Sequence, residues 1–228
     1  MQRQKIKIAL ALFLAASLVL VSVAAVASQD SNVKDLRWGG GHKNGGIDTV
    51  YHTIQVTGAD ANSVTFNILG SAVKTKTGNV SIMNHTAPLG VTYYFANDTA
   101  VFANRKGDMK NKTAGKFHRP PMVSYNDAKI NIAGASAVIA MKNMAVNRLA
   151  DNTTEVQFSA FSVYLPDGTG KTYKLDTPVK IDRSKADKTV KITGSKQFRA
   201  DLQDALKGGA KFPANAAPVP LKTIDSKM

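Results

Sequence analysis

An uncharged apolar run from Ile8 to Ala27 constrains this chain more than any other feature of its sequence. Three basic residues precede the run, no acidic residue does, and it ends in Ala-Val-Ala. A basic start, an apolar stretch and a small-residue end are typical of a secretory signal peptide. We therefore expect residues 1–27 to stand apart from the fold and the remainder to lie beyond the cytoplasmic membrane.

The length of the run leaves the fate of this leader open. A signal peptide has an apolar core of about 7–15 residues, whereas a spanning helix needs about 20. The Ala-x-Ala ending favours cleavage after Ala27, and the alternative is an N-terminal membrane anchor helix. In both cases we expect the body to be secreted or anchored on the outer face of the cytoplasmic membrane, with membrane contact only through residues 8–27.

The exported body is basic and contains no cysteine. Removing residues 1–27 takes away three of the 30 Lys and Arg residues and none of the 16 Asp and Glu residues, which leaves a net charge of +11. Without cysteine, disulfide-stapled mini-domains and thiolate metal or redox sites are excluded. A positive surface attracts polyanions, which outside a cell include acidic polysaccharides and other anionic surface polymers. The compartment argues against chromosomal nucleic acid as a partner.

Short runs with period-two alternation predict a mainly β fold. Residues 49–56 and 63–69 alternate apolar and polar positions around a Gly/Asp/Asn turn and predict a hairpin. Further strand-length runs follow at 79–83, 91–95, 99–103 and 189–193. We expect an antiparallel β-sandwich of about eight to ten strands, Ig-like or jelly-roll-like.

Two later segments do not follow this simple strand pattern. Residues 135–150 fit either a helix or a strand paired with 155–165, and we favour the strand. One helix is expected after Ser195, which is its predicted N-cap. It ends at Gly208-Gly209, and its apolar residues form a stripe along one face. The expected organisation is a leader at 1–27, a Gly-rich flexible segment at 28–48, a β-rich domain with a C-terminal helix at 49–209 and a Pro-rich tail at 210–228.

A basic stretch between Asn104 and Pro121 interrupts the strand pattern. A loop of this length in a compact domain is unusual and often functional or disordered. We interpret it either as a solvated loop or as a contact for an anionic polymer. The candidate polyanion-binding residues are Arg105, Lys106, Lys110, Lys112, Lys116 and Arg119.

The pattern Asn-x-Ser/Thr marks acceptors for N-linked sugars on exported chains. Chance in an Asn- and Thr-rich chain is the alternative explanation. The candidate acceptors are Asn79, Asn84, Asn97, Asn111 and Asn152.

No catalytic, metal or cofactor motif is recognisable. Residues 168–172, GTGKT, resemble the end of a phosphate-binding loop, but Leu165 occupies the position where the motif needs glycine. The four histidines show no metal-ligand spacing, and the one pair that merits a test is His52 with Asp48. We therefore expect no cofactor and no enzyme activity.

Three hypotheses for function follow. The first is a glycosylated, non-catalytic cell-surface or secreted protein with a structural or interaction role, such as an envelope or appendage component that self-associates or contacts other envelope proteins. The second is a binding module for extracellular anionic polymers through residues 104–119. The third is an exported hydrolase with an unrecognised site.

Overall fold

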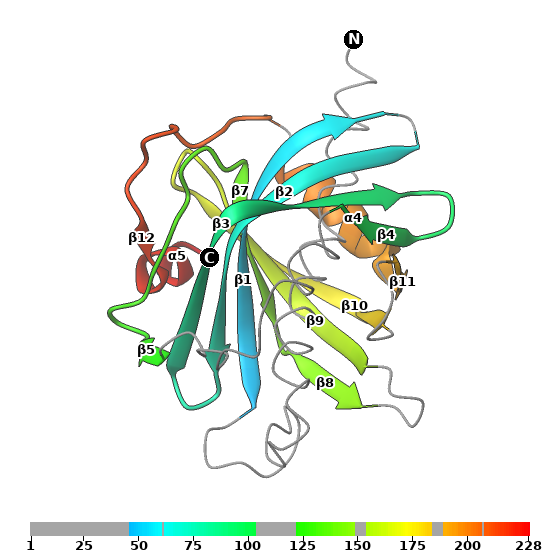
Figure 1. Cartoon of the computed structure of the whole chain (residues 1–228). Coiled ribbons are helices and arrows are strands. Elements are labelled where there is room, and N and C mark those ends of the chain that lie inside the picture. Colours follow the sequence, from blue (N-terminus) through cyan, green and yellow to red (C-terminus); the bar gives the residue numbers. More distant parts are fainter. Residues whose placement is uncertain (1–45, 61, 104–121, 149–153, 184–188, 207) are drawn as a thin grey trace, which may run out of the picture.

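The computed structural model shows a mainly β protein with antiparallel sheets (Figure 1). The described residues are 46–60, 62–103, 122–148, 154–183, 189–206 and 208–228. The predicted leader, most of the Gly-rich segment and the whole basic stretch lie outside them. Among the described residues, no helix is both long and apolar enough to cross a membrane.

Twelve strands and two helices make up the described part of the chain. The strands of the first half are β1 (Ile47–Ala59), β2 (Ser63–Thr75), β3 (Asn79–Tyr94), β4 (Thr99–Phe102), β5 (Met122–Ser124) and β6 (Lys129–Ile130). The remaining elements are β7 (Ala137–Lys142), β8 (Ala145–Arg148), β9 (Thr154–Tyr164), β10 (Gly170–Arg183), β11 (Thr189–Thr193), α4 (Ser195–Ala205), β12 (Val219–Pro220) and α5 (Leu221–Lys227).

Most strands belong to one ten-stranded sheet that closes on itself. The hydrogen-bonded order runs β10-β11-β4-β3-β2-β1-β7-β9, and β9 also pairs with β10, which joins the two ends. β5 pairs with β3, β8 pairs with β9, and β12 and β6 form a separate two-stranded sheet. This pairing gives one closed sheet rather than two comparable facing sheets, so the Ig-like or jelly-roll sandwich is not confirmed.

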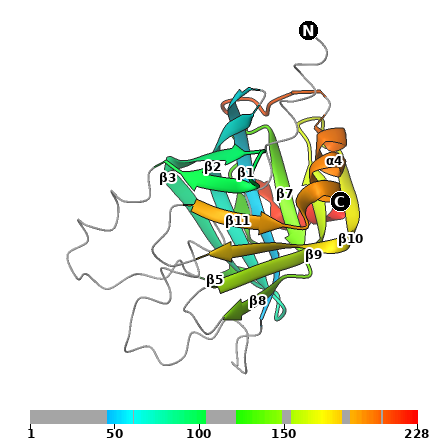
Figure 2. The ribbon, with the colours of Figure 1, turned by 90° about the vertical axis from the view of Figure 1, so that its right-hand side faces the viewer.

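Two apolar clusters lie on opposite faces of the closed sheet. The inner cluster takes side chains from every strand of the ring, because period-two alternation turns alternate residues of each strand inward. Phe198 and Leu202 of α4 complete it. The outer cluster covers β1 and β7 with residues 128–135 and the C-terminal segment from Phe212 onward. Figures 1 and 2 show α4 and α5 at different places on the sheet.

The local predictions are largely confirmed. The first hairpin forms as β1 and β2, and the described part of residues 135–150 contains the strands β7 and β8, both paired with β9. GTGKT runs from the end of a turn into the first residues of β10, not into a phosphate-binding helix. The predicted runs at 79–83 and 91–95 are two halves of a single strand, β3.

The predicted cap of α4 is wrong. Its N-cap is Gly194, in the left-handed conformation with φ 74°, and no side chain caps the helix. A Cβ at Gly194 would lie 2.5 Å from the carbonyl oxygen of Pro178, so close packing as well as φ requires glycine here. Ser195 is instead buried at the start of the helix, and its hydroxyl caps no backbone group.

Candidate functional site

Three of the candidate sugar acceptors are described, and all three are exposed. Asn79 begins β3, Asn84 lies in its first half, and Asn97 lies in the turn between β3 and β4. Their side chains therefore line one strand and its two ends. Asn111 and Asn152 lie outside the described residues.

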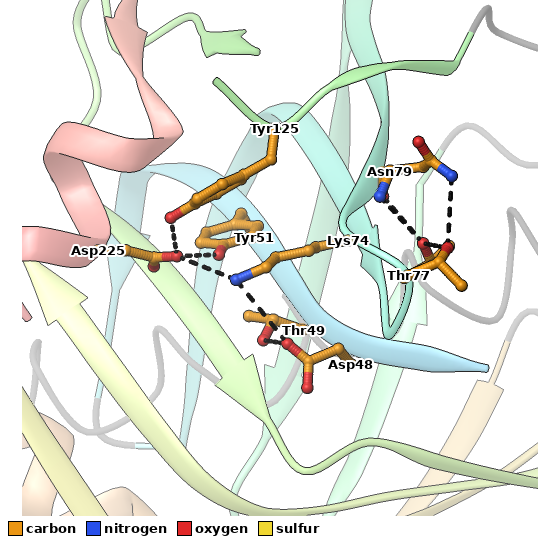
Figure 3. Close-up of polar contacts among 9 residues, drawn as sticks. Asp48, Thr49, Tyr51, Lys74, Thr77, Asn79, Tyr125 and Asp225 are labelled. Atoms are coloured by element: carbon orange, nitrogen blue, oxygen red, sulfur yellow. Dashed lines mark hydrogen bonds and ion pairs between the residues drawn. The ribbon is translucent and has the colours of Figure 1, made fainter. Parts of the chain in front are cut away.

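Threonine hydroxyls in the neighbouring turns form hydrogen bonds with the side chains of Asn79 and Asn97. Thr99 Oγ1 donates to Asn97 Oδ1 at 2.6 Å, so the two polar residues of that tripeptide are in direct contact. Asn79 donates from Nδ2 to Thr77 Oγ1 at 3.3 Å, as Figure 3 shows. Both asparagines are exposed.

Asp98, the central residue of the Asn97 tripeptide, is fixed by its backbone conformation and by two side-chain contacts. Its φ is 48°, and its carboxylate accepts from Tyr93 Oη and pairs with Arg199 of α4 at 3.0 Å. Burial and the contact with Asp98 raise the pKa of Tyr93. The tight turn is therefore fixed by both the core and α4.

The six candidate polyanion-binding residues lie outside the described residues, but the structure defines where their stretch begins and ends. β4, which precedes it, pairs with the second half of β3, where Phe102 faces Val91. β5, which follows it, pairs with the start of β3, where Met122 faces Ser81. Both ends of the basic stretch are thus anchored on the strand that carries the acceptor asparagines.

Of the large apolar side chains that the described residues leave exposed, two lie on β5, which follows the basic stretch, and the third, Tyr94, pairs with the start of β4. Met122 is 48% and Val123 is 36% exposed on β5, and Tyr94 is 43% exposed at the end of β3. Apolar groups beside a basic segment are suited to contacts with a partner surface, although single exposed apolar residues are common in monomers.

His52 and Asp48 do not form the pair that the sequence suggested for testing. His52 is fully buried on the inner face, and its Nδ1 lies 2.8 Å from Ser71 Oγ. Burial, with a smaller contribution from nearby His85, lowers the pKa of His52 to about 3. Asp48 instead accepts from Thr49 and lies 3.9 Å from Lys74.

A second polar cluster, which sequence reasoning missed, connects the C-terminal helix to the sheet (Figure 3). Asp225 of α5 accepts from Tyr51 Oη at 2.7 Å and from Tyr125 Oη, and its carboxylate lies 3.5 Å from Lys74 Nζ. The ammonium of Lys74 also lies 4.3 Å from the centre of the Tyr125 ring. No local pattern could reveal this cluster, because its members are far apart in sequence.

The phenols of this cluster are held in the neutral form. Burial first, then the charge of Asp225 and the hydrogen bond to it, raises the pKa of Tyr51. Burial and the hydrogen bond to Asp225 raise the pKa of Tyr125 in the same way. Neutral phenols that donate to a carboxylate fit a structural anchor better than a proton-accepting site.

Among the described residues, no group of three or more His, Cys, Asp or Glu side chains is arranged to hold a metal ion. Comparison with models of protein families, with curated proteins and with solved structures found no match.

Proposed function

We propose that this chain is an exported, N-glycosylated, non-catalytic protein that acts at the cell surface or outside the cell through structural or interaction contacts. The leader, as a signal peptide or anchor helix, accounts for export. The observation that carries the proposal is the exposure of Asn79, Asn84 and Asn97 along one strand and its ends. A polar, sugar-bearing strand is suited to an exterior surface.

The stability that such a protein needs outside the cell is available without disulfides. Two apolar clusters, one on each face of the closed sheet, bury most of the aliphatic and aromatic side chains of the described residues. Apolar burial on this scale drives folding by itself, and closing the sheet removes the edges that would otherwise pair with other chains.

The first test is the intact mass of the protein isolated from the organism that encodes it. We expect either a chain that lacks residues 1–27 or a membrane-bound chain that keeps them. In both cases we expect the mass to be increased by attached sugar. Replacing Asn97 by Gln removes one sugar, whereas the same change at exposed Asn126, which begins no acceptor pattern, leaves the mass of sugar unchanged. An unmodified chain in the cytosol with its leader intact contradicts the proposal.

The interaction role is tested by light scattering of the mature protein after gel filtration and by chemical cross-linking on intact cells. We expect a defined oligomer or cross-links to other envelope proteins. A strictly monomeric protein that forms no cross-link to another envelope component contradicts this part.

The second candidate function is binding of an anionic polymer through residues 104–119. It is favoured by the anchoring of both ends of this stretch on β3, next to the exposed side chains of Met122 and Val123. Heparin affinity that falls steeply with salt is expected, since such contacts act through charge. Replacing the six basic residues by Ser abolishes it, whereas replacing Lys174, Lys180 and Lys191 of β10 and β11 does not.

A further inference from the structure

Three neighbouring strands bring a pair of histidines to the inner face of the closed sheet. In the strand register His52 of β1 faces Ser71 of β2, and Ser71 faces Met83 of β3. His85 follows Met83 by two residues on the same strand, so both side chains belong to the same face. The pKa of His52, lowered mainly by burial and less by the charge of His85, agrees with this shared face.

Each of these histidines has a buried nitrogen without a partner. Nε2 of His52 and Nε2 of His85 are inaccessible to solvent and make no hydrogen bond to the described residues. Buried polar atoms are normally paired, so two such atoms on one face, from the two strands that flank β2, call for a partner beyond the described residues.

Ser71 orients the first imidazole. When His52 donates its Nδ1 proton to Ser71 Oγ, 2.8 Å away, the lone pair of Nε2 is left free. Metal-binding histidines commonly have this arrangement, with the second ring nitrogen held by a hydrogen bond that fixes the tautomer.

The pairing of β3 with β2 is irregular next to His85. The regular register with β2 ends where Gly70 faces Asn84 and resumes where Ile68 faces Leu89. Pro88 lies inside this interval and cannot donate a ladder hydrogen bond. Local irregularities of this kind redirect side chains and are common beside functional sites. Ala87 and Pro88, in the same interval, are exposed.

We propose that His52 and His85 bind one Cu(I) ion through their Nε2 atoms, with the thioether of Met83 as the third ligand and Ser71 as a positioning residue. Thioether and imidazole are ligands that suit Cu(I). Zn(II) prefers four ligands and commonly adds Cys or carboxylate, which this group lacks. The chain contains no cysteine that would compete for the ion.

The test is an anaerobic titration of the mature protein with Cu(I) in competition with the chelator bicinchoninate. We expect one bound equivalent. Replacing His85 by Asn or Met83 by Leu weakens binding at least tenfold, and Ser71→Ala weakens it about tenfold through loss of orientation.

Matched controls separate this site from other ligands of the chain. The double variant His42→Asn/His118→Asn removes the other two histidines, and Met122→Leu removes an exposed thioether. Both controls are expected to bind Cu(I) as the unmodified protein does. Loss of binding in the double variant, or unchanged binding in His85→Asn, overturns the proposal.

A second measurement keeps the proposal testable when a variant fails to fold. Titration of the unmodified protein with Ag(I), a redox-inert substitute for Cu(I), is followed by nuclear magnetic resonance of the imidazole nitrogens. Shifts of both Nε2 signals, from His52 and His85, support the site. Unchanged signals, as an enclosed water molecule would leave them, or an equally tight response to Zn(II), overturn the assignment to Cu(I).

Discussion

Gly170 begins β10, and the last residues of the chain pass directly over it. A Cβ at this position would lie 2.7 Å from the carbonyl carbon of Lys227 and 2.9 Å from the amide nitrogen of Met228. Thr172, two residues further along, donates to the carbonyl oxygen of Met228. Because Gly170 has no side chain, the end of α5 can lie against the sheet.

We expect Gly170→Ala to destabilise the protein by about 1–3 kcal/mol, the usual cost of forcing atoms into a packed site. Gly58→Ala is the matched control, because a Cβ there meets nothing within 4 Å. Urea unfolding of both variants measures the difference. Equal stability of the two variants would show that α5 moves aside at no cost.

The phenol of Tyr51 makes the fold sensitive to alkali. Because the folded state raises the pKa of Tyr51 above its ordinary value of 10.0, the unfolded chain loses the phenolic proton first as pH rises. Stability from this group is complete below pH 10 and is lost as pH climbs above it. Between pH 9 and pH 11 the loss is about 1.4 kcal/mol.

Replacing Tyr51 by Phe is expected to reduce the alkaline loss of stability by that amount, and the raised pKa values of Tyr93 and Tyr125 leave a smaller remaining slope. The free energy of unfolding is measured in urea at pH 9 and pH 11 for the unmodified protein, for Tyr51→Phe and for Tyr94→Phe. Tyr94, which is 43% exposed, serves as the control and follows the unmodified protein. A Tyr51→Phe slope as steep as the control's slope would refute the assignment.

At the scale of elements, α5 is stabilised by the face that it buries. Leu221 and Ile224 are fully buried in the outer cluster, and Asp225 provides the polar contact with β1 and β2. A helix of 7 residues is not stable alone in water, so its conformation depends on docking.

Ile224→Ala is therefore expected to cost about 2–5 kcal/mol through lost burial and the cavity that remains. Lys222→Ala, on the exposed side of the same helix, should change stability by less than about 0.5 kcal/mol. Thermal unfolding followed by circular dichroism measures both. Similar melting temperatures for the two variants would mean that α5 contributes little.

Two prolines lie at irregular registers that a period-two pattern does not reveal. Pro88 lies within β3 and Pro178 within β10, and in both strands the register shifts in the interval that holds the proline. Proline removes one ladder hydrogen bond, so strands tolerate it at such shifts. The pattern at 79–83 and 91–95 therefore predicted two runs where the chain forms one strand.

For the whole molecule, closure of the sheet makes the inner cluster common to every strand of the ring. The outer cluster is built on β1 and β7, which also belong to that ring. The two clusters share strands, and so we expect one cooperative unfolding transition.

Phe198→Ala in the inner cluster and Ile224→Ala in the outer cluster test this expectation. Both should shift the same transition, seen identically by tyrosine fluorescence and by circular dichroism. A separate early transition in Ile224→Ala, with the inner cluster intact, would show that the C-terminal segment unfolds independently.

The sequence by itself determined the antiparallel β class, the first hairpin, the strands at 137–148 and the stretch that forms α4, because these follow from neighbouring residues with a period of two or 3.6. Only the tertiary structure decided that the sheet closes, that α5 forms in the predicted tail and that His52, Ser71 and His85 share one face. These depend on contacts between residues far apart in the chain, such as Tyr51 with Asp225, and no local period encodes them.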